Sequence, residues 1–228
     1  MALRKRDASG GIAFRESFDS LRAMLTRDES PIELPDRIRL PFSFDPADLA
    51  FDLRQFAEGD WRLHYVRDNY QGDWSVLPLR APAGETHPAR MIFSSPTNPD
   101  YVDAPLLARA PNFQQALARF ECPLRAVRLM RLGPGSLIRE HSDHDLDAAL
   151  MGLVRLHVPV TSEVGVEFRL NGLAVAMAPG SVWYLRLADP HSVVNDGDID
   201  RVHLVIDAEM NDWLLQMLHA GVNAARTA

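Results

Sequence analysis

From residue 124 onward, the sequence is a series of short apolar runs separated by turn residues, and this pattern limits the possible folds more than any other feature. The turns include Asn171-Gly172 and Pro179-Gly180, and Asn-Gly between two apolar runs is a strong signal for a β-hairpin. Short strands at this spacing are typical of a β-sandwich or jelly roll. We predict strands over 126–132, 150–160, 164–170, 173–178, 182–187, 191–195 and 201–207.

Helical patterns lie on both sides of this strand-rich region. A strand predicted over 39–44 is followed by Asp45-Pro46, an N-cap with proline at the first helical position, which predicts a short helix. A second helix is predicted over 105–120. The C-terminal residues carry one apolar stripe at helical spacing, with Asp207 or Asn211 as the cap. This stripe packs either on the chain's own barrel or on a partner subunit.

The composition indicates an ordinary soluble protein. The chain has 228 residues, of which 46% are hydrophobic and 24% charged, enough for a sizeable core. Its net charge of −7 argues against nucleic-acid binding, which usually needs a basic surface. The single cysteine, Cys122, cannot form an intrachain disulfide and favours a reducing compartment, so we expect a cytoplasmic protein. No segment approaches the ~20 apolar residues of a membrane span, and no export signal is recognisable.

The segment 137–145, Leu-Ile-Arg-Glu-His-Ser-Asp-His-Asp, contains an H-x-D arrangement just after a strand-like run. On an extended segment, His141 and Asp143 project to the same side. A third candidate ligand, His191, follows the restrained pair Asp189-Pro190. Two histidines and a carboxylate can occupy one face of an Fe(II) octahedron and leave three positions open. The alternative is that the H-x-D lies in a polar turn and that His191 is an ordinary strand histidine.

Two predicted strands share the pattern Arg-x-His. Because side chains alternate along a strand, Arg155 and His157 lie on one face, and so do Arg201 and His203. The intervening residues are apolar, so if these pack in the core, the basic residues line a cavity. A buried arginine needs an anionic partner and binds carboxylates bidentately. The pattern therefore favours a site for a small dicarboxylate; the alternative places both arginines in solvent on a half-exposed sheet.

The spacing of His191 and Arg201 connects the metal motif to the Arg-x-His strands. A β-hairpin with its turn near 195–197 would place the two residues on neighbouring strands. A 2-oxo acid would then chelate the metal through its oxo and 1-carboxylate groups, and its distal carboxylate would meet the guanidinium.

These motifs together resemble the aspartyl/asparaginyl β-hydroxylase family of 2-oxoglutarate-dependent oxygenases. The resemblance extends over roughly residues 60–215. The matching stretches are Leu132-Gly-Pro-Gly135, Glu140-His-Ser-Asp143, Arg155-Leu-His157-Val-Pro159, Pro179-Gly-Ser-Val-Trp-Tyr184, Pro190-His191, Asn195-Asp-Gly197 and Arg201-Val-His-Leu-Val-Ile-Asp207. The resemblance implies a mostly β fold, a double-stranded β-helix (jelly roll, cupin-like) with flanking helices. We expect this fold to form a single domain over 31–228, and the polar residues 1–30 to form a flexible arm.

The resemblance also implies roles for individual residues. It makes His141 and His191 the metal histidines and Asp143 the third ligand of Fe(II), although some members lack a carboxylate at that position. Arg201 is implied to anchor the distal carboxylate of 2-oxoglutarate, and Arg155-Leu-His157 matches positions that help to hold this cosubstrate. His144 and Asp145 either orient the ligands or are simply solvated.

The implied activity is hydroxylation of an unactivated C–H bond with O2 and 2-oxoglutarate, which releases succinate and CO2. The expected substrate is a small molecule that contains an amino acid, either free, peptidyl or carrier-linked. Two other classes remain open. A cupin-like metal enzyme that uses no 2-oxo acid would not need Arg201, and an inactive jelly-roll binding or sensor protein would bind iron weakly or not at all.

Upstream residues are candidates for the substrate side of the site. The candidate side chains are Trp61, His64, Asn69, Tyr70, Trp74 and Arg80. The alternative is that the aromatic residues among them belong to the core. The segment 80–103 is rich in proline, glycine and polar residues, so we predict a loop there. That loop is either a lid that orders on substrate binding or a plain surface loop.

Overall fold

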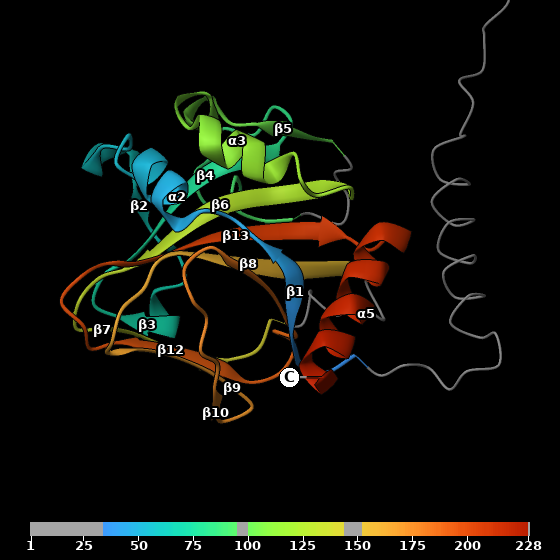
Figure 1. Ribbon diagram of the computed structural model, residues 1–228. Helices are drawn as coiled ribbons and strands as arrows, with labels where there is room; N and C mark the ends of the chain where they lie inside the picture. The colour runs from blue at the N-terminus through green and yellow to red at the C-terminus, as the bar shows by residue number, and fades with distance from the viewer. Residues whose placement is uncertain (1–33, 95–99, 144–151, 228) are drawn as a thin grey trace, which may run out of the picture. The chain divides into compact units, whose positions relative to one another are not determined.

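Eight antiparallel strands form the larger of two sheets (Figure 1). The computed structural model describes residues 34–94, 100–143 and 152–227, and the described residues from Pro35 onward belong to one compact unit. In spatial order the strands are β1 (Arg37–Ser43), β11 (Ser181–Leu185), β8 (Leu153–Thr161), β13 (Arg201–Glu209), β6 (Leu124–Leu132), β4 (Trp74–Pro82) and β2 (Arg62–Leu63), with β5 (Tyr101–Asp103) paired to β4.

The smaller sheet lies against one face of the larger sheet (Figure 1). Its strands, in spatial order, are β10 (Leu173–Ala174), β9 (Val166–Leu170), β12 (His191–Asn195), β7 (Ser136–His141) and β3 (Tyr70–Gln71). The eight strands from β6 to β13 divide evenly between the sheets, as β11-β8-β13-β6 and β10-β9-β12-β7. This arrangement is a jelly roll, so the predicted mostly β fold is confirmed. Every predicted run contains a strand, although the run over 173–178 is reduced to two residues.

The helices pack on the larger sheet and on one another. Helix α2 (Pro46–Leu53) contacts β8, helix α3 (Pro111–Leu117) contacts α2, and helix α5 (Asp212–Thr227) contacts β1. In Figure 1, α2 and α3 lie on the side of the larger sheet that faces away from the smaller one. No helix in the described ranges is long and apolar enough to cross a membrane.

Side chains cap two of these helices. The Asp45 carboxylate accepts a hydrogen bond from the backbone N–H of Ala47, as predicted. At α5 the side chain of Asn211 accepts from the N–H of Leu214, so Asn211 rather than Asp207 is the cap. Gly221 lets α5 approach β1 closely, because a Cβ there would lie 2.4 Å from the carbonyl oxygen of Arg39. The helix therefore packs on its own chain.

The structure corrects the predictions for two segments. The helix predicted over 105–120 is divided into a 3₁₀ helix, Pro105–Arg109, and α3. The residue before Pro111 has φ −130° and ψ 73°, because proline disfavours the helical conformation of the residue that precedes it. The loop predicted over 80–103 begins and ends as paired strand, with Arg80 opposite Asp103.

The hairpins predicted at 171–172 and near 195–197 differ in outcome. The Asn171-Gly172 hairpin is confirmed: it joins β9 to β10, and both residues have positive φ. The hairpin predicted near 195–197 is wrong, because β12 lies in the smaller sheet and β13 in the larger. The buried side-chain amide of Asn195 donates to the carbonyl oxygens of Leu132 and Ile199, which secures the crossing between sheets.

Candidate active site

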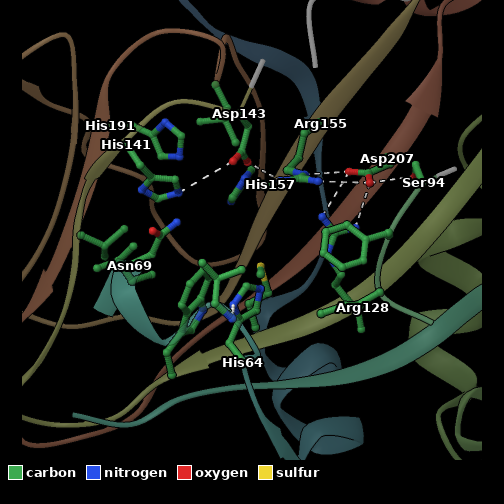
Figure 2. A pocket seen from close by; sticks show the side chains of 18 of the residues that line it. His64, Asn69, Ser94, Arg128, His141, Asp143, Arg155, His157, His191 and Asp207 are labelled. Carbon is green, nitrogen blue, oxygen red and sulfur yellow. Dashed lines mark hydrogen bonds and ion pairs between the residues drawn. The ribbon is translucent and has the colours of Figure 1, made fainter. Parts of the chain in front are cut away.

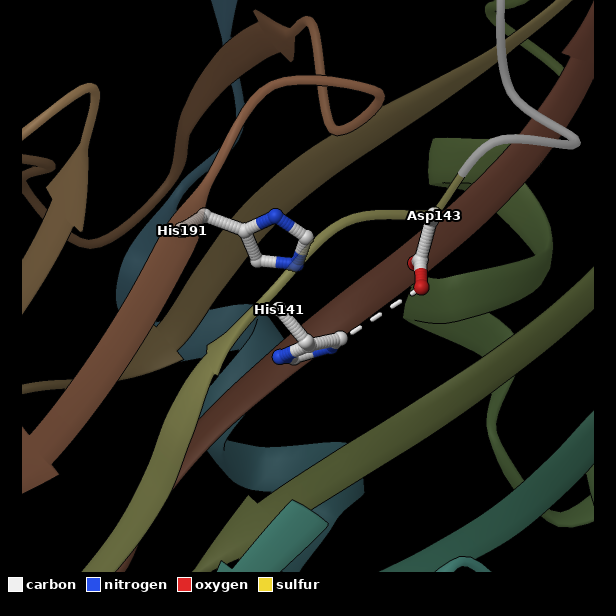
Figure 3. Close-up of side chains that lie close together, drawn as sticks. All are labelled: His141, Asp143 and His191. Carbon is white, nitrogen blue, oxygen red and sulfur yellow. Dashed lines mark ion pairs between the residues drawn. The ribbon is translucent and has the colours of Figure 1, made fainter.

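The two predicted metal histidines lie opposite each other on neighbouring strands of the smaller sheet (Figure 3). His191 begins β12, His141 ends β7, and their ring centroids are 4.3 Å apart. From the Val193–Ile138 pair to this pair, β12 advances two residues but β7 advances three, so β7 contains a β-bulge. In an unbroken ladder Glu140 would face His191. The bulge thus determines which side chain meets His191, a common function of bulges beside active sites.

Backbone carbonyls hold both imidazoles in one tautomer. Nδ1 of His141 lies 2.8 Å from the carbonyl oxygen of Arg139, and Nδ1 of His191 lies 3.0 Å from that of Asp189. In each hydrogen bond the Nδ1–H donates, which leaves Nε2 free to bind a metal. Burial lowers the pKa of His191, so its ring is neutral at neutral pH, as a metal ligand must be.

Asp143 completes the cluster (Figure 3). One ligand atom from each of the three residues lies within 4.8 Å of the others, and Asp143 Oδ1 is 3.8 Å from His141 Nε2. The backbone N–H of Asp143 donates to the carbonyl of Leu187 at 2.7 Å, which fixes the chain just beyond β7. Two imidazole nitrogens and one carboxylate oxygen form the donor set of a non-haem Fe(II) site, so the residues present fit that ion.

Arg155 holds the other oxygen of Asp143 (Figure 2). Its Nη1 donates to Asp143 Oδ2 at 2.7 Å, while Nε and Nη2 donate to the two oxygens of Asp207 at 2.7 and 3.2 Å. The side chain is 13% exposed, which excludes the alternative that this arginine faces solvent. Burial alone would lower the pKa of Arg155, but the two carboxylates raise it above its usual value.

Asp207 lies at the centre of this charge network (Figure 2). It is fully buried and also accepts hydrogen bonds from Arg128 Nη1 at 3.0 Å and Ser94 Oγ at 2.8 Å. Burial would raise the pKa of Asp207, but the guanidinium charges of Arg128 and Arg155 hold it below its usual range, so it is ionised. The sequence prediction missed Arg128, Ser94 and Asp207. A signal was present for Asp207, which is in phase with Arg201 on its strand.

Arg201 has a different environment. It is 3% exposed, and no carboxylate of the described chain lies within ion-pairing distance. Its Nη2 donates to Nδ1 of His203 at 3.0 Å, whereas its Nε has no hydrogen-bond partner among the described residues. Burial lowers the pKa of Arg201 to about 9, so it remains charged at neutral pH. A buried cation without an anion is costly, and this one fits an anionic ligand.

His203 connects Arg201 to His157. Nδ1 of His203 must accept, because the arginine nitrogen can only donate. Nδ1 of His157 lies 3.3 Å from the same atom, and Nε2 of His157 is buried without a partner in the described structure. Burial, and next the charge of Arg201, lower the pKa of both histidines far below its usual value, so both rings are neutral. The sequence placed His203 on the correct face but did not assign it to the site.

One cavity of about 170 Å³ joins the metal cluster to Arg201. Of the six candidate substrate residues, His64, Asn69 and Trp74 line it. The rings of His64 and Trp74 stack at 3.7 Å, and burial lowers the pKa of His64 to about 3. Asn69 lines the same cavity as His141 (Figure 2). The cavity thus contains the His-Asp-His cluster, a guanidinium with no carboxylate partner in the described ranges, and an aromatic wall.

The model of the family described as aspartyl/asparaginyl β-hydroxylase matches residues 52–210. The chain belongs to the aspartyl/asparaginyl β-hydroxylase family. It is 27% identical over 169 residues to an L-proline cis-4-hydroxylase from Rhizobium meliloti (strain 1021), a match that covers 73% of this chain. The chain spans 58% of the length of that curated relative.

Two solved structures are also similar to this β-hydroxylase family member. One is an oxidoreductase of the 2OG-Fe(II) oxygenase family from Burkholderia pseudomallei, 21% identical, with a TM-score of 0.48 and coverage of 92% of this chain and 96% of the other. The second is a prolyl-4-hydroxylase from Pseudomonas putida, 16% identical, with a TM-score of 0.45 and coverage of 77% and 93%.

The other three candidate substrate residues, Trp61, Tyr70 and Arg80, do not line the cavity. The guanidinium of Arg131 covers the ring of Trp61 at 4.6 Å, and the Tyr70 hydroxyl donates to the carbonyl of His64 at 3.0 Å. Arg80 joins three strands, since it donates to the carbonyls of Leu124 and Tyr101 and pairs with Asp103.

Part of the candidate lid contributes to the mouth of the cavity. Ile92, Phe93 and Ser94 line it, and the Phe93 ring meets the Tyr65 ring edge-on at 5.0 Å. His144 and Asp145, which were expected either to orient the metal ligands or to be solvated, lie outside the described residues.

Proposed function

We propose that this chain is an Fe(II)- and 2-oxoglutarate-dependent oxygenase that hydroxylates an unactivated C–H bond. One O2 would be consumed, one oxygen atom entering the substrate and the other entering succinate, with release of CO2. The observation that carries the proposal is the presence, in one cavity, of a His-Asp-His cluster and a buried arginine that has no carboxylate partner among the described residues. Membership of the aspartyl/asparaginyl β-hydroxylase family supports it.

The metal end of the cavity would hold Fe(II) through His141, Asp143 and His191. When bound, the iron supplies the activation of O2 that the hydroxylation of an inert C–H bond needs. The protein residues fix its coordination: the carbonyls behind each Nδ1 set the imidazole orientation, and Arg155 sets the carboxylate. Three protein ligands leave open positions for a chelating cosubstrate and for O2.

The opposite end would hold the distal carboxylate of 2-oxoglutarate on Arg201. A carboxylate there would supply the anion that this buried guanidinium lacks, in a site from which water is largely excluded. His203 would keep the guanidinium in place through its hydrogen bond to Nη2. We propose that His157 contributes to the cosubstrate pocket through its unpaired Nε2 and that Arg155 contributes mainly through Asp143.

The substrate is proposed to contain an amino acid, free, peptidyl or carrier-linked. The curated relative is named for action on L-proline, which supports this class. His64, Asn69 and Trp74 would contact the substrate, because they line the cavity. The side-chain amide of Asn69 makes no hydrogen bond within the described ranges and would be available to a polar substrate group. We propose the cytoplasm as the place of action, since the single cysteine is free.

Anaerobic titration tests the proposal. Addition of Fe(II) and 2-oxoglutarate to the protein should produce the visible metal-to-ligand charge-transfer band of the chelate, and His141→Ala should abolish it. Absence of the band in the wild-type protein would contradict the proposal. Full hydroxylase activity of an Arg201→Ala variant would instead favour a metal enzyme that does not use a 2-oxo acid.

A further inference from the structure

Ser94, Asp207 and Arg155 form a hydrogen-bonded chain that ends on the metal ligand Asp143 (Figure 2). We propose that Asp207 is a positioning residue, which sets the orientation of the Asp143 carboxylate through Arg155 and is itself fixed by Ser94. The inference rests on the proposed function only in requiring that a divalent metal binds the His-Asp-His cluster.

The geometry divides the two oxygens of Asp143 between different partners. Oδ2 accepts from Arg155 Nη1 at 2.7 Å, whereas Oδ1 faces His141 Nε2 at 3.8 Å. Asp207 holds two other nitrogens of the same guanidinium, Nε at 2.7 Å and Nη2 at 3.2 Å. Because a guanidinium is planar and rigid, fixing those two nitrogens also fixes Nη1. Asp143 is thereby presented to a metal through one defined oxygen.

The charges explain why Asp207 is needed for this arrangement. Arg128 is buried and Arg155 is largely shielded from solvent, and in the described structure Asp207 and Asp143 are the carboxylates that pair with them. Asp207 balances one of the two positive charges and pairs with both guanidiniums. Without its charge, Asp143 would be the remaining anion for two buried cations. A metal would then have to compete with them for the Asp143 carboxylate.

Ser94 extends this network to the part of the cavity wall formed by residues 92–94. Its hydroxyl donates to Asp207 Oδ2 at 2.8 Å and accepts from the backbone N–H of Ala126 on β6 at 3.3 Å. The preceding residues, Ile92 and Phe93, line the cavity. The segment that would meet the substrate is therefore connected through side-chain hydrogen bonds to a metal ligand.

A double-mutant cycle on metal binding tests the inference without using activity. Co(II) alone is titrated into the wild-type protein and into Ser94→Ala, Arg155→Lys and the double variant, and its visible spectrum is followed. Arg155→Lys keeps the charge but lacks the planar fork that holds Asp207 and Asp143 in one fixed geometry, and should weaken binding by about 10- to 100-fold, the range typical of groups that orient a ligand. Ser94→Ala should weaken it by roughly threefold to tenfold, and should have no further effect in the Arg155→Lys background.

Ser75→Ala is a matched control. Like Ser94, Ser75 takes part in a side-chain hydrogen bond with a charged group, since its buried hydroxyl accepts from Arg131 Nε at 2.9 Å; unlike Ser94, it does not line the cavity. Its removal should change the thermal midpoint about as much as Ser94→Ala does and leave Co(II) affinity unchanged.

Two outcomes would overturn the positioning role: an unchanged Co(II) affinity in Ser94→Ala, or an equal loss from this substitution in both backgrounds. A wild-type protein that binds no Co(II) would contradict the proposed function and this inference together. If the wild-type protein binds Co(II) and the variants bind it with the same affinity, only this inference would be contradicted.

Discussion

Arg155 and Arg201 occupy the same position in the Arg-x-His motif of two adjacent antiparallel strands, yet their surroundings differ. Each precedes a histidine by two residues and lines the same cavity; Arg201 is buried, and the Arg155 side chain is 13% exposed. Arg155 contacts two carboxylates, whereas Arg201 has none within reach in the described structure. The carboxylates raise the pKa of Arg155 against the effect of burial, while burial lowers the pKa of Arg201. An arginine that already has its anions supports the site, and an arginine without one is available to a ligand.

The largest expected difference between the two is in stability. In metal-free protein, Arg155→Met should lower the free energy of unfolding by about 3–5 kcal/mol, because three charge-assisted hydrogen bonds are lost, Asp143 loses its cation and the buried Asp207 keeps only that of Arg128. Arg201→Met should leave that free energy unchanged or raise it, since it removes an unpaired buried charge. Urea denaturation of both variants measures this. Equal losses would show that Arg201 has an internal anionic partner and would end the comparison.

For the binding of 2-oxoglutarate, substitution of Arg201 should have the larger effect of the two. Arg201→Met should weaken 2-oxoglutarate binding by about 2–4 kcal/mol, or roughly 30-fold or more, as expected when one partner of a buried charge pair is truncated. The charge-transfer band reports the affinity. Arg80→Met is the control, because Arg80 is a structural arginine outside the cavity lining. The affinity of this variant for 2-oxoglutarate should equal that of the wild-type protein.

His203 offers a finer test of how Arg201 is held. His203→Phe keeps a ring but removes the acceptor of the 3.0 Å hydrogen bond from the guanidinium. We expect the KM for 2-oxoglutarate to rise by about tenfold, equivalent to roughly 1.5 kcal/mol for a hydrogen bond to a charged group, with little change in kcat. A loss confined to kcat would assign His203 a role other than positioning Arg201.

His64, a buried base that can lose its charge by releasing a proton, should make the stability of the protein depend on pH. Burial lowers its pKa to about 3, whereas the unfolded chain has the ordinary value of 6.5. Between these values only the unfolded state takes up the proton, so stability falls as pH falls below 6.5, by at most about 1.4 kcal/mol per pH unit from this group. His64→Phe should make the decline shallower when unfolding is measured at pH 7.5 and pH 5. An unchanged slope would mean that His64 is already protonated in the folded state.

Local sequence patterns predicted the parts of the site that depend on strand phase. His191, Arg201 and His157 lie on the faces that alternation assigns to them. The sequence around His141 does not predict which side chain faces His191, because the bulge in β7 determines that His141 rather than Glu140 does so. No feature of the H-x-D motif indicates that extra residue.

The errors concern contacts between distant parts of the chain. The pairing of Arg128 with Asp207 joins residues 79 apart and exists because β13 lies beside β6. The turn at 195–197 carries the same kind of signal as the real hairpin at 171–172. What makes it a crossing is the hydrogen bond from Asn195 to Leu132, 63 residues earlier. Strand order determines both contacts, and local patterning does not specify strand order.

The cross-strand pairing of His141 and His191 has a consequence for the motions of the smaller sheet. A metal bound by both rings would connect β7 to β12 where their ladder ends, and so act as a removable cross-link. At a free concentration of about 100 times its dissociation constant, such an ion would stabilise the state in which β7 and β12 are paired by about 2.7 kcal/mol. Amide hydrogen exchange through local opening of these two strands should therefore slow by about a hundredfold in the metal-bound protein, which makes the exchange rate of this ladder a direct reporter of metal occupancy.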